Sequence, residues 1–242
     1  MTQATHHPAE RVIIVQRDVQ QPARLVADVF RQAMRSRGTF VVNLLSSPGA
    51  GKTTLLQATA QHWRTEEARS DDRRYRMAVL VGDIATDRDA QRLAPYATVA
   101  QLTTGGACHL DLSLVQRGWD AMQQPACEFL FLENVGNLVC PAAHDLGEHL
   151  RVILLSTTEG DDKPAKYPKA FRTSQGMVIS KTDLLPHVPF SCDAAVADAR
   201  RLQPDLAVFP VSALQPTGIA AWCQYLVDQR TKFLNGHTIN ST

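Results

Sequence analysis

One stretch, residues 39–56, constrains the fold of this chain more than any other, because it predicts a buried strand, a glycine-containing loop and a helix in succession. Residues 40–45 form a short apolar run rich in β-branched side chains, which is typical of a strand buried on both faces of a parallel sheet. The next nine residues read SSPGAGKTT. They match the phosphate-binding pattern Gly-x4-Gly-Lys-Ser/Thr, except that Ser46 stands where the first glycine is expected.

The chemistry of this loop suits anionic phosphates. Glycines let the backbone turn so that successive N–H groups point at one cluster of oxygens, and the next helix adds its free N–H groups. We expect Lys52 to bridge the β- and γ-phosphates, Thr53 to ligate Mg²⁺ and Thr54 to donate to the α-phosphate. A glycine-rich turn without a ligand is the plain alternative, which the strand–loop–helix context disfavours. The expected nucleotide-binding residues here are Gly49, Ala50, Gly51, Lys52, Thr53 and Thr54.

Length, charge and cysteine count narrow the class of protein. A chain of 242 residues can form one well-buried α/β domain. Its formal net charge is +1, with acids and bases interspersed, so we expect neither nucleic acid nor a membrane as a partner. No apolar run approaches the roughly 20 residues that span a bilayer, and residues 1–21 lack the layout of a signal peptide. We therefore expect a cytoplasmic protein whose five cysteines are ligands or buried apolar residues.

The rest of the chain alternates predicted strands and helices, which favours an α/β fold with a mostly parallel sheet and helices on both faces. Further strands are expected at 77–81, 99–102, 129–132, 151–156, 177–179 and 207–209. Helices are expected at 23–37, 52–68, 86–93, 110–122, 193–202 and 217–230. The pattern predicts a polar connection over 157–169, a mobile polar segment over 1–22, one folded domain over 23–231, and a C-terminal tail over 232–242.

Two acidic residues follow predicted buried strands, and open α/β sheets bind ligands at the carboxyl ends of their strands. We expect Asp83 to hold Mg²⁺ or its water there, with helix capping as the plain alternative. Glu133 precedes Gly136 by three positions, like the γ-phosphate sensor of switch GTPases, whose usual acid is Asp. The Gly136 N–H is expected to meet the γ-phosphate, so that this loop orders with GTP and relaxes with GDP. The expected catalytic residues are Lys52, Asp83 and Glu133, and the expected magnesium ligands are Thr53, Asp83 and Glu133.

The C-terminal part carries a pattern typical of guanine recognition. Residues 180–183 read SKTD after a predicted strand, where guanine-specific GTPases have Asn-Lys-x-Asp. Asp183 can accept hydrogen bonds from guanine N1–H and the 2-amino group, which adenine lacks, while the stem of Lys181 stacks along the base. Ser180 replaces Asn, and we expect its shorter side chain to brace the loop less well. This should affect the affinity for the nucleotide more than the specificity for guanine. The backbone N–H groups of Ser212 and Ala213 are expected to reach guanine O6.

Taken together, these motifs and three further segments resemble the HypB family of GTPases, which mature nickel–iron hydrogenases. The segments are GACHLD ending at Asp111, ENVGNLVCP beginning at Glu133, and EGDDKP beginning at Glu159. The resemblance spans roughly residues 24–230. It implies a P-loop NTPase fold of the SIMIBI class, GTP and GDP as ligands, and low intrinsic hydrolysis of GTP. It also implies nickel insertion, a GTP-promoted homodimer, a HypA-like nickel chaperone and a hydrogenase large subunit precursor as partners.

The resemblance further implies a Ni²⁺ or Zn²⁺ site near the dimer interface, built from Cys108, His109 and Cys140. Two thiolates and an imidazole suit these metals and disfavour Mg²⁺, and three protein ligands leave a position open on a carrier. The plain alternative is that Cys108 and Cys140 are small buried apolar residues. Many HypB proteins carry a Cys-rich or His-rich N-terminal stretch. The first cysteine here is Cys108, so we expect no nickel site N-terminal to it.

Three other functions compete with this interpretation. A related SIMIBI GTPase can deliver metal to urease or another metalloenzyme, although the Cys-Pro-His motif of urease GTPases is absent. A metal-binding chaperone with a vestigial nucleotide site is disfavoured by the intact Lys52, Thr53 and Asp183. An ATP-dependent kinase is disfavoured by Asp183.

Overall fold

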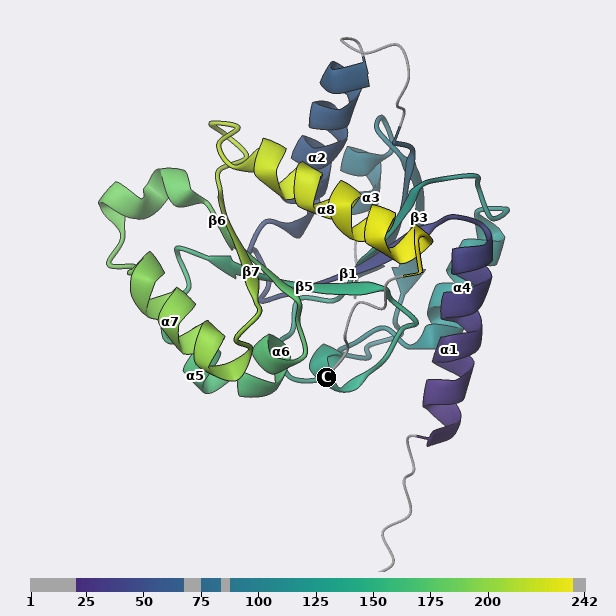
Figure 1. The fold of residues 1–242 in the computed structure, drawn as a ribbon, viewed down its shortest axis with the longest axis horizontal. Coiled ribbons are helices and arrows are strands. Elements are labelled where there is room, and N and C mark those ends of the chain that lie inside the picture. Colours follow the sequence, from purple (N-terminus) through teal and green to yellow (C-terminus); the bar gives the residue numbers. More distant parts are fainter. Residues whose placement is uncertain (1–20, 68–74, 84–87, 237–242) are drawn as a thin grey trace, which may run out of the picture.

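A seven-stranded parallel sheet forms the centre of the molecule (Figure 1). The structure is a computed structural model that describes residues 21–67, 75–83 and 88–236. All neighbouring strands pair in parallel, in the order β3-β2-β4-β1-β5-β6-β7. The strands are β1 (Phe40–Ser46), β2 (Met77–Asp83), β3 (Thr98–Thr103), β4 (Phe129–Glu133), β5 (Leu150–Ser156), β6 (Gly176–Ser180) and β7 (Ala207–Val211).

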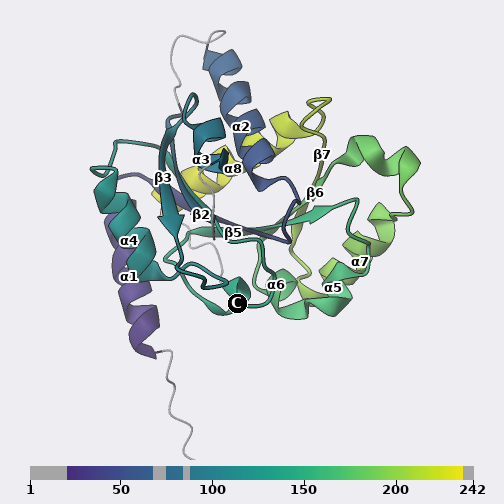
Figure 2. The ribbon, with the colours of Figure 1, turned by 180° about the vertical axis from the view of Figure 1, so that it is seen from behind.

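Helices cover both faces of this sheet (Figures 1 and 2). One face packs against α2 (Lys52–Glu67), α3 (Arg88–Leu93) and α8 (Ile219–Leu234). The other face packs against α1 (Gln21–Ser36), α4 (Leu112–Ala121), α6 (Pro168–Arg172) and α7 (Cys192–Leu202). This arrangement confirms the predicted α/β fold. No helix in the described ranges is both long and apolar enough to cross a membrane.

The central strand β1 is fully buried, and its side chains alternate between the two helical layers. Phe40, Val42 and Leu44 pack on the side of α2 and α8, whereas Val41 packs on the side of α1 and α4. Both faces must therefore be largely apolar, which explains the run of apolar residues that only Asn43 interrupts. Because β1 lies between β4 and β5, the loop that follows it emerges at the middle of the carboxyl edge.

The predicted polar connection over 157–169 is wrong in its second half, which contains the short helix α5 (Lys163–Lys166) and the start of α6. Each of these helices has proline in its first turn, where its missing N–H costs no hydrogen bond. Phe171 of α6 is fully buried against the sheet. Tertiary packing therefore stabilises a segment whose sequence is too short and polar to show a helical period.

The predicted C-terminal tail is also wrong at its start, because α8 continues to Leu234. Phe233 is buried and its ring contacts Phe40 with 5.4 Å between centroids. Polar residues separate the last apolar positions of α8, so the sequence pattern did not predict its final turn. The remainder of the tail, from 237, and most of the predicted N-terminal segment, 1–20, lie outside the described residues.

Candidate nucleotide and metal site

The phosphate-binding loop leaves the carboxyl end of β1 and enters α2 at Lys52. Gly49 and Gly51 have φ angles of +73° and +96°, a region that residues with side chains rarely adopt. Lys52 is buried, and its Nζ donates to the hydroxyl of Ser46 at 2.9 Å. The serine at the first-glycine position thus contacts the lysine expected to bind phosphate.

Thr53 and Glu133, two of the expected Mg²⁺ ligands, lie together beneath this loop. Thr53 Oγ1 donates to Glu133 Oε1 at 2.8 Å, and Glu133 Oε2 has no hydrogen-bond partner among the described residues. Burial raises the pKa of Glu133 to about 7, although nearby Lys52 lowers it. Carboxylate and hydroxyl oxygens with an unsatisfied acceptor fit Mg²⁺. Asp83 ends the neighbouring strand β2, but its side chain lies outside the described part of the structure.

We expect Glu133 to make the nucleotide-free protein less stable as the pH rises from about 4.5 to about 7. Its folded pKa lies above its unfolded value, so the folded state binds more protons in this window and the free energy of unfolding falls as they leave. Ionisation of this residue should lower the free energy of unfolding by about 3 kcal/mol. Urea unfolding of the wild type and Glu133→Gln, with EDTA at about pH 5 and pH 7.5, measures it. Equal pH slopes in the two proteins would contradict the expectation.

The predicted γ-phosphate sensor loop lies directly on the phosphate-binding loop. A Cβ atom on Gly136 would come within 2.8 Å of the Pro48 Cα, so only glycine fits this approach. The next residue, Asn137, forms an isolated antiparallel bridge with Ser46. A movement of either loop must therefore displace the other loop.

The expected guanine-binding residues gather on the opposite side of β1, at the ends of β6 and β7. Lys181 adopts a left-handed conformation with φ of +60°, and Asp183 Oδ1 accepts a hydrogen bond from the hydroxyl of Ser212 at 2.6 Å. Ser180 Oγ donates to the carbonyl of Ala50 in the phosphate-binding loop at 2.7 Å. The shorter side chain thus braces the phosphate-binding loop directly, a contact that the sequence did not reveal.

The three predicted ligands of the transition metal come together on two loops at the same sheet edge. Cys108 and His109 follow β3, Cys140 follows β4, and their ligand atoms all lie within 4.8 Å of one another. Asp111 accepts a hydrogen bond from Leu114 N at 2.8 Å and so caps α4, which fixes the end of the first loop. A hydrogen bond with Cys140 raises the pKa of the Cys108 thiol. Binding of a cation here must therefore release protons.

The remaining cysteines lie away from this group. Cys127 and Cys223 are buried, and burial raises their pKa values to about 11 and about 12, as expected for unreactive apolar residues. Cys192 differs from the prediction because it is only half-buried at the start of α7.

Buried hydrogen bonds connect the nucleotide side to the metal side. Asn137 Nδ2 donates to the carbonyl of Cys108 at 3.4 Å. Asn134, next to Glu133, accepts from the N–H of Leu110 at 3.2 Å and donates to Asn43 at 3.3 Å. Sequence reasoning missed these contacts, although a buried asparagine in the apolar strand β1 was a signal of them.

A second buried chain of contacts continues to the loop of Cys140. The amide of Asn43 donates to Glu148 Oε1 at 3.2 Å, and Arg151 Nε donates to the same oxygen at 2.7 Å. Arg151 Nη2 also donates to the carbonyl of His144 at 2.7 Å. The imidazole of His144 stacks on His109, with 3.9 Å between ring centroids, and burial lowers the pKa of His144.

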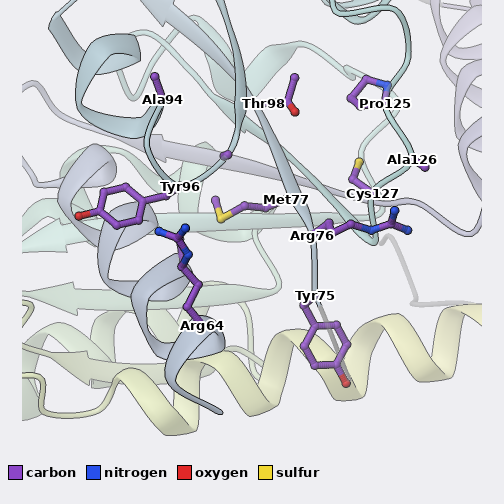
Figure 3. A pocket seen from close by; sticks show the side chains of 12 residues that line it. Arg64, Tyr75, Arg76, Met77, Ala94, Tyr96, Thr98, Pro125, Ala126 and Cys127 are labelled. Carbon is purple, nitrogen blue, oxygen red and sulfur yellow. The ribbon is translucent and has the colours of Figure 1, made fainter. Parts of the chain in front are cut away.

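A separate pocket of about 480 Å³ opens at the other end of the sheet, where β2 and β3 begin (Figure 3). Figure 3 shows Arg64 and Tyr96 close together in its wall, and the guanidinium carbon of Arg64 lies 5.5 Å from the Tyr96 ring centroid. The pocket contains no expected nucleotide or metal ligand. It is therefore not part of the candidate site.

Comparison with known proteins identifies relatives of this chain. The model of the CobW/HypB/UreG nucleotide-binding domain matches residues 40–210. The hydrogenase maturation factor HypB of Azotobacter chroococcum mcd 1 is 42% identical over 221 residues, which are 91% of this chain and 70% of that relative. This chain belongs to the HypB family. The match confirms the resemblance drawn from the sequence motifs.

Solved HypB structures confirm the P-loop NTPase fold. HypB from Helicobacter pylori in complex with nickel has a TM-score of 0.81 and 32% identity, and the match covers 91% of this chain and 100% of that one. HypB from Archaeoglobus fulgidus has a TM-score of 0.77 and 30% identity, covering 87% of this chain and 99% of that one.

Proposed function

We propose that this HypB-family protein is a GTP-hydrolysing metallochaperone switch that binds nickel and drives its insertion during maturation of nickel–iron hydrogenase. One observation carries the proposal: the ligand atoms of Cys108, His109 and Cys140 converge within 4.8 Å on two loops, one of which contacts the phosphate-binding loop. The relative from Azotobacter is a hydrogenase maturation factor, and the Helicobacter pylori HypB was solved with nickel. The nickel complex favours nickel over zinc as the cargo, and the likeness to the Azotobacter relative favours hydrogenase over urease as the target.

The nucleotide site is proposed to hold GTP or GDP with Mg²⁺. Bound GTP and Mg²⁺ supply a hydrolysable phosphoanhydride and a cation that neutralises its charge. On the protein side, Lys52 binds the terminal phosphates, Glu133 and Thr53 present oxygen ligands together with Asp83, and Gly136 offers its N–H. Recognition of guanine is assigned to Lys181, Asp183, Ser212 and Ala213. We expect intrinsic hydrolysis to be slow.

The metal site is proposed to lie at a GTP-promoted homodimer contact. Val139, next to Cys140, is 62% exposed and is therefore accessible to a second copy of the chain. Two thiolates and one imidazole also leave a coordination position open for a partner. We propose a HypA-like nickel chaperone as the donor and the hydrogenase large subunit precursor as the recipient, in the cytoplasm. The GTPase domain, first placed at 23–231, is proposed to extend through α8.

We expect the affinity for Ni²⁺ to differ between the GDP form and the GTP-analogue form of the protein. Movement of the sensor loop shifts Asn137, and with it the backbone of Cys108, relative to Cys140. Thiolate–metal distances near 2.3 Å tolerate little error, so a shift of about an ångström weakens the site. By linkage, the metal must change the nucleotide affinity by the same factor. Competition titrations with a chromophoric chelator on both forms, over a range of protein concentrations, measure the difference.

Asn137→Ala provides the matched variant for this experiment, because it removes the side-chain contact to Cys108 and keeps every ligand. We expect it to bind nucleotide and metal but to show a smaller difference between the two forms. Identical Ni²⁺ affinity in all conditions for the wild type would mean two independent sites on one domain, and would contradict the switch.

Asp183→Asn should shift the preference from GTP towards xanthosine triphosphate. The amide donates a hydrogen bond where the carboxylate accepted one, which suits the extra oxygen of xanthine. Hydrogen bonds to charged groups contribute about 1.5–3 kcal/mol, so GTP binding should weaken by at least about tenfold. Binding of both nucleotides and ATP is measured with Asp205→Asn, an exposed aspartate, as the control. Equal binding of ATP and GTP by the wild type would defeat the guanine assignment.

A further inference from the structure

The strongest feature outside the assigned residues is the flat contact between two histidine rings beside the metal site. The rings of His109 and His144 lie 3.9 Å apart between centroids, with 12° between their planes. We propose that His144 is a positioning residue of the metal site, which holds the His109 ring in its coordinating orientation by stacking on it. This inference rests on the proposed metal site and adds a residue to it.

The backbone around His144 makes it a firm support. Between Cys140 and His144 the chain forms one 3-10 turn, Pro141–Ala143, in which the N–H of His144 donates to the carbonyl of Pro141 at 3.2 Å. The carbonyl of His144 accepts from Arg151 Nη2 at 2.7 Å. Arg151 lies on β5 and is itself buried in an ion pair with Glu148. These hydrogen bonds thus hold the backbone of His144 against the sheet.

His109 comes from the other metal loop, so the stack joins two separate segments. His109 and Cys108 follow β3, whereas His144 and Cys140 follow β4. A ring stacked on one face limits the rotation of the imidazole and shields that face from water. Both effects favour the metal-bound form.

The geometry favours stacking over direct coordination by His144. Among the described residues, the group whose ligand atoms all lie within 4.8 Å contains Cys108, His109 and Cys140 but not His144. Because the two rings are nearly parallel, a metal ion bound in the plane of the His109 ring lies outside the plane of the His144 ring, in which imidazole nitrogens bind metals. His144 therefore acts through His109.

The test is a Ni²⁺ competition titration of the full chain in its GDP form, with three substitutions. His144→Ala should lower the Ni²⁺ affinity by about three- to tenfold, the range expected for one aromatic pair. His144→Phe keeps a flat ring without nitrogens, so its affinity should stay within about twofold of the wild type. It should also keep the thiolate-to-nickel charge-transfer band. In a His109→Ala background, His144→Ala should cause no further loss.

Two outcomes overturn the inference. Unchanged Ni²⁺ affinity in His144→Ala means that the stack contributes nothing. A loss in His144→Phe as large as that in His144→Ala means that a nitrogen of His144 binds the metal directly. GDP affinity is measured in each variant as a check that the domain is folded. If the wild type and Cys140→Ala bind Ni²⁺ equally, the proposed metal site fails; if only Cys140→Ala is impaired and His144→Ala is not, the positioning role alone fails.

Discussion

Cys140→Ala should lose most of the Ni²⁺ and Zn²⁺ binding of this protein while its GTP binding stays intact. Cys140 supplies one of three ligand atoms that lie within 4.8 Å of one another, and alanine supplies none. Changing a residue that hydrogen-bonds a metal ligand already costs about 10–100-fold in metal affinity, so losing a ligand should cost more than about 100-fold. Chelator competition with Ni²⁺ and with Zn²⁺ measures the loss.

Cys192→Ala is the matched control, because it also removes a half-buried thiol but lies on α7, outside the metal group. We expect it to bind both metals like the wild type. GTP binding of Cys140→Ala should be unchanged because Cys140 lies beyond Gly136 and Asn137, which make the contacts to the phosphate-binding loop. Metal binding that persists in Cys140→Ala would mean that Cys108 and Cys140 are ordinary half-buried apolar residues.

Lys52→Ala should abolish measurable GTP hydrolysis and weaken binding of the triphosphate. Lys52 is buried at the start of α2, and its ammonium group lies 2.9 Å from the Ser46 hydroxyl within the phosphate-binding loop. Alanine removes the positive charge that is proposed to face the terminal phosphates. Losing one preorganised group of this kind costs on the order of 10²–10³-fold in turnover, or about 3–4 kcal/mol. Single-turnover hydrolysis and equilibrium binding of GTP measure the two effects.

Lys232→Ala, an exposed lysine on α8, serves as the control for the loss of a positive charge. It should hydrolyse GTP like the wild type. Unchanged turnover in Lys52→Ala would show that the phosphate-binding loop is misassigned. No turnover in the wild type would instead favour a metal-binding chaperone with a vestigial nucleotide site, and that result is distinguishable because metal binding would remain.

The order of the elements along the chain was predictable because the inner strands β1, β4, β5 and β6 are short, largely apolar runs buried on both faces. The run at 40–45 became β1, with one more residue at its end, and the helical period after Lys52 became α2. The carboxyl ends of parallel strands meet at one edge, so Thr53 and Glu133 could be placed near each other from sequence. The convergence of Cys108 with Cys140 was a further expectation, drawn from family resemblance, and the geometry agrees with it.

The sequence by itself thus determined the fold class, the strand that carries the phosphate-binding loop, and the identity of the candidate ligands, because these depend on local periodicity and residue chemistry. Only the tertiary structure decided which groups touch. Asn134 and Asn137 bond to the metal loop, Ser180 braces Ala50, and His144 stacks on His109. These contacts join residues at or beyond the ends of different strands, and no short pattern encodes them. They form because the strand order brings separate loops to one edge, where buried polar groups must find partners.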